Sequence, residues 1–251
     1  MDRFSQLEFG ETSPQPKRSQ GEPVRDADYF NKEALRYWLA GDFELALRNY
    51  SRVLENNSTA LDAWVGQVLM LIELEEYREA TVWADKALEL FPEHPELFAA
   101  KAVACLRDAK AEKAISYSDN SISKDNVTPR VWLARAEVLL NRKSPIADNC
   151  ISKAISIAGN DAPIIKLEAA RVLRKKGSYS AAIGYLNDVV KVFPKSALAW
   201  YELGCCQAKL GFPEARATLE QSIKLRPDWN TAKTALKKFG RRGFFSKLFK
   251  R

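Results

Sequence analysis

Three stretches of this chain repeat one pattern: GDFELALRNYSRVLENN (residues 41–57), EEYREATVWADKALELFP (residues 75–92) and GSYSAAIGYLNDVVKVFP (residues 177–194). Each begins with glycine or glutamate, places an aromatic residue three positions before an alanine, and continues with apolar residues three or four positions apart. Spacings of three and four residues bring side chains to one face of an α-helix. Each stretch is therefore predicted to be a turn followed by an amphipathic helix.

The same pattern extends over most of the chain at a fixed interval. Bulky residues recur every 34 positions, with one lysine among them: Phe30, Trp64, Phe98, Trp132, Lys166 and Trp200. Alanine recurs at nearly the same interval: Ala46, Ala80, Ala114, Ala147, Ala182 and Ala215. Because self-similarity at a fixed period is the sequence signature of stacked repeats, the working part of this protein is expected to be a surface rather than a pocket.

These residues resemble the tetratricopeptide repeat, in which two antiparallel helices form each unit. The resemblance implies an all-α fold, a right-handed superhelical solenoid of helix pairs closed by a C-terminal capping helix. It covers six repeats: 27–60, 61–94, 95–128, 129–162, 163–196 and 197–229. The fourth and sixth repeats are one residue short in the turn, so we expect Ser144-Pro145 and Phe212-Pro213 to start their second helices. Where Lys166 replaces the aromatic residue, Ile165 or Leu167 is expected to pack in its place.

The two ends of the chain differ from the repeats. Residues 1–26 are rich in Pro, Gly, Ser and Gln, which predicts a disordered leader. Residues 230–239 are predicted to form the capping helix, since one apolar stripe is typical of a solenoid end. Gly240 and Gly243 are expected to end that helix and to leave residues 240–251 as a separate basic amphipathic tail.

Charge and the reactive residue types exclude several classes of function. Residues 27–232 carry no net charge, whereas residues 233–251 carry eight basic and no acidic side chains, so nucleic acid is not an expected partner of the repeats. The four cysteines lack metal-ligand spacing, and His94 has no evident catalytic partner. We expect no enzymatic activity, no metal and no cofactor. The start of the chain has no apolar segment typical of a signal peptide, so a cytoplasmic location is expected.

The resemblance also implies a binding site, because the first helices of tetratricopeptide repeats line a concave groove that binds peptides or helices. The groove positions that carry over are Asn31, Lys32, Leu35, Trp38, Val65, Leu69, Ile72, Val103, Leu106, Arg107, Arg130, Arg171, Arg174 and Lys175. This set is apolar in its first half and basic in its second, which favours an amphipathic protein segment with acidic residues. The second and third repeats do not complete the family's carboxylate clamp, so a receptor for chaperone C-termini is not expected.

The tail resembles the short membrane-targeting sequences of bacterial cell-division ATPases. Its candidate membrane-binding residues combine basic and apolar types: Arg241, Arg242, Phe244, Phe245, Lys247, Leu248, Phe249 and Lys250. An anionic membrane is therefore the expected second partner, at the inner face of the membrane. The alternatives are a tail that docks in its own groove or in that of a partner, contacts with nucleic acid, and a solvated tail.

Overall fold

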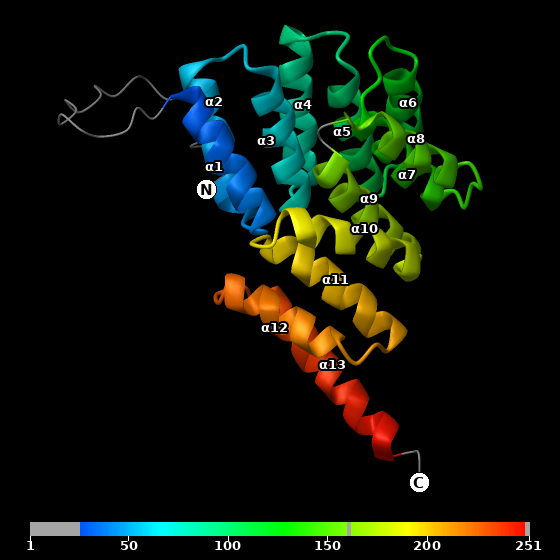
Figure 1. Ribbon diagram of the computed structural model, residues 1–251. Helices are drawn as coiled ribbons and strands as arrows, with labels where there is room; N and C mark the ends of the chain where they lie inside the picture. Colours follow the sequence, from blue (N-terminus) through cyan, green and yellow to red (C-terminus); the bar gives the residue numbers. More distant parts are fainter. Residues whose placement is uncertain (1–25, 160–161, 249–251) are drawn as a thin grey trace, which may run out of the picture.

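The computed structural model describes residues 26–159 and 162–248, with side chains up to Gly240. Within this part the regular elements are all helices (Figure 1): α1 Ala27–Leu39, α2 Phe43–Asn56, α3 Leu61–Glu73, α4 Tyr77–Leu90, α5 Pro95–Arg107, α6 Ala111–Ile122, α7 Pro129–Asn141, α8 Ala147–Ile157, α9 Ala162–Lys176, α10 Tyr179–Val192, α11 Ala197–Leu210, α12 Ala215–Leu225 and α13 Asn230–Leu248. Each odd-numbered helix up to α11 packs against the helix that follows it, and consecutive pairs stack. The predicted all-α solenoid is confirmed.

The turn inside each helix pair contains one residue with left-handed backbone geometry. These residues are Gly41, Glu75, Ala109, Lys143, Gly177 and Gly211, with φ between 56° and 85°, and they follow one another at intervals of 34. Left-handed geometry ends a helix sharply and suits glycine, but it recurs here at three positions where glycine is absent. The backbone therefore keeps the repeat more strictly than the side chains do.

The fourth and sixth repeats are short just after this turn residue. Ala147 and Ala215 follow their left-handed residues by four positions, whereas the other alanines of the series follow theirs by five. The expectation that the prolines there start the second helices is wrong, because α8 and α12 begin only at Ala147 and Ala215. The N–H groups of these two alanines donate to carbonyls three residues back, at 3.4 and 3.2 Å. Each proline, which has no N–H to donate, thus lies in a tight turn ahead of the helix.

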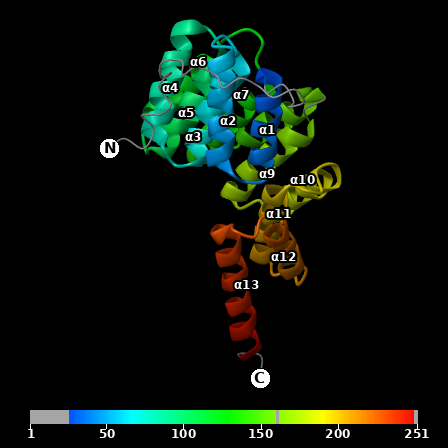
Figure 2. The ribbon, with the colours of Figure 1, turned by 90° about the vertical axis from the view of Figure 1, so that its left-hand side faces the viewer.

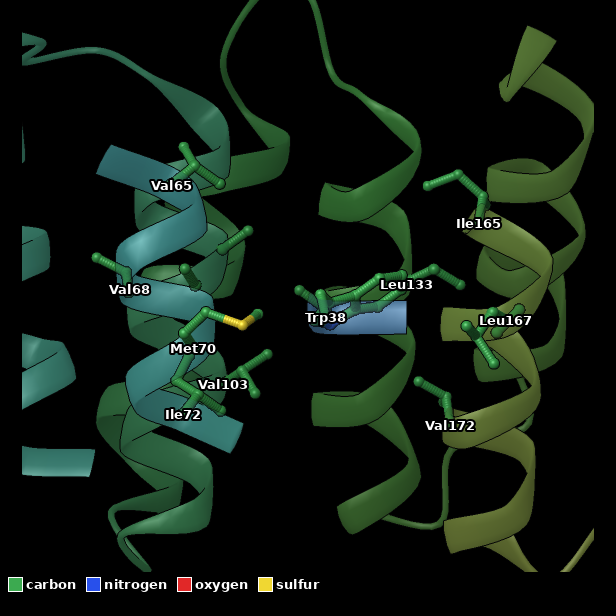
Figure 3. Packing of buried hydrophobic residues seen from close by; sticks show 14 of the residues in the cluster. Trp38, Val65, Val68, Met70, Ile72, Val103, Leu133, Ile165, Leu167 and Val172 are labelled. Carbon is green, nitrogen blue, oxygen red and sulfur yellow. The ribbon is translucent and has the colours of Figure 1, made fainter. Parts of the chain in front are cut away.

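Small residues hold the helices close together. The six alanines that recur along the sequence at intervals of about 34 residues are all fully buried. A Cβ added at Gly204 would lie 2.7 Å from Leu219 Cγ, and one at Gly66 would lie 2.5 Å from the Tyr50 ring. At Lys166 the packing is taken over by Ile165 and Leu167, which are 2% and 0% exposed. One continuous apolar core runs from α1 to α11. Figure 3 shows its central part, with labelled residues from α1, α3, α5, α7 and α9.

Helix α13 is longer than the sequence predicts. The helix continues through Gly240 and Gly243 to Leu248, and it extends away from the stacked pairs (Figure 2). The expected break is wrong because a glycine inside a helix costs only about 0.5–1 kcal/mol relative to alanine, which weakens a helix without ending it. The capping segment and most of the tail thus share one helical backbone.

Candidate binding surface on the concave face

The first helices of the pairs face a common interior. A central cavity is lined by residues of α1, α3, α5, α7 and α9. Its apolar wall includes Trp38, Val65, Ile72, Val103 and Leu133, which are each at most 8% exposed. Trp38 and Leu133 lie between the residues of α3 and those of α9 (Figure 3). The concave face is therefore filled by its own side chains at its centre.

The room left in this cavity is small. Its volume is about 100 Å³, which holds several water molecules but not an α-helix, whose diameter with side chains is about 10 Å. A partner segment therefore cannot lie within this cavity, although a separate pocket of about 640 Å³ borders the ion pairs described below.

A chain of ion pairs crosses the concave face beside the cavity. Arg171 of α9 donates from Nη2 to Glu73 Oε2 of α3 at 2.5 Å, and from Nε to Glu202 Oε1 of α11 at 3.0 Å. Glu73 also lies 3.6 Å from Arg107 Nη1 of α5. Arg174 pairs with the same Glu202. These pairs join helices that lie far apart in the sequence.

Further pairs complete this charge network. Glu137 accepts from Arg107 Nε at 3.0 Å and from Lys175 Nζ at 2.7 Å. Arg130 donates to Glu168 at 3.1 Å. The five basic residues that α5, α7 and α9 contribute to the predicted groove are thus each paired with a carboxylate of the same chain. The central concave face is neutralised internally.

Burial and pairing shift the ionisation of the network. Burial alone would raise the pKa of Glu73, but the cations Arg171, Arg107 and Lys175 outweigh it and lower the pKa to about 2. The pKa of Glu137 is lowered for the same reasons, since Arg107 and Lys175 outweigh its burial. Burial dominates at Glu168 and raises its pKa despite Arg130. Glu73 therefore stays ionised well into acid.

The first helix pair meets the last two pairs at a contact that we call the clasp, formed by Leu39, Gly41, Asp42, Ser196, Arg226 and Trp229. Ser196 Oγ donates to the Leu39 carbonyl at 2.7 Å, and Arg226 Nη1 donates to the Gly41 carbonyl at 2.5 Å. Arg226 also lies 3.4 Å from Asp42, and the Trp229 ring packs on Gly41. The hydrogen bonds of the clasp join residues up to 185 positions apart and draw the superhelix into a closed turn.

A larger groove opens at the C-terminal end of the same face, between α9, α11 and α13. Its volume is about 870 Å³, within the range of ligand sites. Tyr179, Tyr201 and Phe239 supply aromatic surface, and the exposed Lys209 and Lys238 lie at its edge. Neither lysine forms an ion pair with a residue that the structure describes. We call this the C-terminal groove.

The structure separates the predicted groove residues into three groups. Trp38, Val65, Leu69, Ile72, Val103, Arg107, Arg130, Arg171 and Lys175 line the central cavity. Arg174 lines the C-terminal groove. Asn31 and Lys32 are exposed on α1, and Leu35 and Leu106 are half-buried, all outside the central cavity.

Several residues of this surface are missed by the sequence pattern. The pattern places Lys238 and Phe239 in a capping helix with no binding role. A signal for them exists, since α13 follows α12 where the first helix of a seventh repeat would begin. No local signal identifies the clasp, because it joins repeats at opposite ends of the array.

The predicted membrane-binding residues lie outside the side chains that the structure describes. The backbone from Arg241 to Leu248 belongs to α13, and Phe249 and Lys250 are not described. Among the described helices, none combines the length and the apolar character needed to span a bilayer.

The chain is similar to several known proteins. Hsp70-Hsp90 organizing protein of Triticum aestivum is 26% identical over 198 residues, 77% of this chain and 34% of that protein. The chain thus spans about a third of that relative. A structure of the APC/C hetero-tetramer Cut9–Hcn1 superposes with a TM-score of 0.55 at 18% identity, over 85% of this chain and 43% of the other. A thermophilic tetratricopeptide repeat protein of Thermus thermophilus superposes with a TM-score of 0.53 at 14% identity, over 72% of this chain and 98% of the other. These structures show the fold alone.

The family assignment rests on two matched regions. Residues 31–95 and 167–228 match the tetratricopeptide repeat, and together they make up just over half of the chain. The two regions contain most of the first two helix pairs and of the last two, so the match and the observed architecture agree. The chain belongs to the tetratricopeptide repeat family.

Proposed function

We propose that this protein is a non-catalytic interaction scaffold of six repeats that holds a segment of a protein partner on its concave face. The observation that carries this proposal is the C-terminal groove, which offers about 870 Å³ where the central cavity offers about 100 Å³. The partner segment enters at this groove.

Charge and shape indicate the chemistry of that segment. The groove is lined by Arg174, Lys209 and Lys238, and no carboxylate is among the described residues that line it. Its aromatic wall suits apolar side chains on one side of a peptide or short helix. These features favour an amphipathic segment with acidic residues.

Matched charge reversals test this assignment. Lys209→Glu with Lys238→Glu should abolish retention of synthetic amphipathic peptides that pair leucine with glutamate, and should create retention of the same peptides with lysine. Lys224→Glu with Lys233→Glu is the control, since both lysines are exposed on α12 and α13 outside the groove. Fluorescence anisotropy of the labelled peptides measures the effect. Equal binding by both double variants would contradict the groove assignment.

Charge reversal at Arg171 is not an equivalent test. Arg171 lies between Glu73 and Glu202, so a third carboxylate there would place buried like charges side by side. Loss of peptide binding by such a variant would then reflect loss of folding rather than loss of a contact with the peptide. Exposed lysines avoid this ambiguity.

A second proposal concerns the tail, which we infer attaches the scaffold to the inner face of an anionic membrane. The observation that favours it is the helical backbone of α13, which carries the basic and aromatic sequence of residues 241–248 away from the stacked pairs (Figure 2). Each cationic side chain near an anionic surface contributes about 1 kcal/mol to the binding free energy. Because ordering the tail offsets part of this gain, the attachment is expected to be weak and reversible.

Flotation with anionic vesicles tests the tail. Phe245→Asp with Phe249→Asp should release the chain from the vesicles, and added salt should weaken attachment because it screens the charges. Phe212→Asp, at a phenylalanine 39% exposed in the turn before α12, should leave flotation unchanged. If the tail variant floats as well as the intact chain, the tail does not attach this protein to the membrane.

A further inference from the structure

We propose that the clasp is an autoinhibitory contact, which keeps the central cavity shut when formed and admits a partner segment to the central concave face when it parts. The inference rests on the proposed function, since it regulates access to the same concave face.

The clasp is built from contacts that can separate without breaking a helix pair. It consists of the hydrogen bonds from Ser196 and Arg226, the ion pair with Asp42 and one aromatic ring packed on Gly41. Each helix pair keeps its own apolar interface with its neighbours along the stack. In such arrays a small rotation at several interfaces adds up to a large displacement of the ends. The clasp can therefore part while every helix pair stays folded. We call the boundary that the clasp closes, between the first helix pair and the end of the array, the seam.

Each polar side chain of the clasp has a second partner on its own side of the seam. Arg226 Nε lies 3.7 Å from Asp228. Ser196 Oγ accepts from the N–H of Ala199 at 3.1 Å, and Asp42 accepts from the N–H of Leu45 at 3.2 Å. These side chains keep a partner when the clasp parts, which avoids the free-energy cost of polar groups left without hydrogen bonds.

The ion pair that bridges the second and fifth helix pairs has the same property. If Arg171 and Glu73 separate, Arg171 keeps Glu202 and Glu73 keeps Arg107. Separation of a buried pair is costly mainly when it leaves a charge alone, and that does not occur here. The network thus supports both a closed and an open arrangement.

Opening would uncover an apolar strip. Trp38, Ile72, Val103, Leu133 and Val172, which come from α1, α3, α5, α7 and α9, together line the central cavity. Separated, they would present the apolar surface that a helix in a groove requires.

Access to the cavity tests the clasp directly in the full chain. Val103→Cys places a thiol in the central cavity, and its reaction with a bulky maleimide is followed by mass spectrometry of the peptide that carries it. Adding Arg226→Ala should speed the reaction about tenfold, the shift expected when such hydrogen bonds are removed. Small-angle scattering should show a larger radius of gyration with unchanged helical circular dichroism.

The controls separate opening from unfolding. Arg216→Ala removes an exposed arginine of α12 whose partner Glu220 lies on the same helix, so it should change neither measurement. Asp42→Asn keeps the helix cap and loses the charge facing Arg226, so it should speed the reaction in the same direction. Equal rates for Arg226→Ala, Asp42→Asn and Arg216→Ala would overturn the clasp. The maleimide reaction needs no binding partner, so its result is independent of peptide binding at the C-terminal groove. Failure of the peptide experiment would leave the clasp proposal intact, and failure of the maleimide experiment would leave the groove proposal intact.

Discussion

The central cavity and the C-terminal groove are parts of one concave face with opposite properties. In the centre, apolar side chains fill the space and the basic residues that line it each have a carboxylate partner. At the C-terminal end the space is about 870 Å³, and Lys209 and Lys238 lie without ion pairs among the described residues. Position on a repeat therefore does not by itself make a residue available to a partner. Availability depends on what the rest of the superhelix places opposite it.

Truncation of one aromatic residue in each region should give the largest contrast. Trp38→Ala, at a site 6% exposed, should lower the free energy of unfolding by about 3–5 kcal/mol because it leaves a cavity. Phe239→Ala, at a half-buried site in the C-terminal groove, should cost about 1 kcal/mol and weaken peptide binding instead. Urea titrations measure both. Equal losses would contradict the distinction between a core and a surface groove.

Removal of the Glu73 charge should have the next largest effect. Glu73→Gln should cost about 3 kcal/mol at neutral pH, near the lower end for a broken buried pair because Arg107 and Arg171 keep other carboxylates. The folded pKa of Glu73, about 2, lies below its ordinary value of 4.5, so its contribution is complete above pH 4.5 and is lost as pH falls toward 2. The difference between variant and parent should shrink over that window in urea titrations at several pH values. A difference that stays constant would show that Glu73 is not held ionised.

Two glycines with the same backbone geometry can isolate the clasp. Gly41 and Gly211 have φ of 75° and 78°, so alanine should cost each about 1 kcal/mol in backbone strain. An added Cβ at Gly41 would lie 2.9 Å from Trp229, whereas one at Gly211 meets nothing within 4 Å. Gly41→Ala should therefore cost about 1 kcal/mol more than Gly211→Ala in thermal or urea unfolding. Equal costs would mean that Trp229 does not pack on the first turn.

A small stabilising effect should come from a substitution in the turn between α5 and α6. Ala109 has a φ of 59°, where glycine avoids the steric penalty of Cβ. Ala109→Gly should raise the free energy of unfolding by about 0.5–1 kcal/mol without altering either binding region. Differential scanning calorimetry would detect it as a higher melting temperature. A lower melting temperature would indicate that the turn does not hold this geometry in solution.

The sequence predicts what depends on neighbours along the chain. The 34-residue interval identifies the helix pairs, the buried alanines and the substitution of Ile165 and Leu167 for an aromatic residue. It also identifies concave positions, of which Trp38 and Val103 do line a shared cavity.

Contacts across the superhelix could not be predicted in the same way. Arg171 and Glu73 are 98 positions apart, and Arg226 and Gly41 are 185 apart. Both contacts depend on rotations accumulated over many repeats, which no local pattern contains. The sequence therefore predicted a basic half of the groove without predicting that Glu73, Glu137, Glu168 and Glu202 neutralise it. The length of α13 was missed for another reason, because two glycines lower helix stability only modestly.

The division of the concave face can be measured directly through thiol access in the otherwise unchanged chain. Thr234→Cys places a thiol in the C-terminal groove and Val103→Cys places one in the central cavity, and the same bulky maleimide is offered to each. Thr234 is exposed and Val103 is 8% exposed, so we expect the groove thiol to react about a hundredfold faster, since access to the central site requires an opening step. Equal rates at the two positions would contradict the division into a closed centre and an open end.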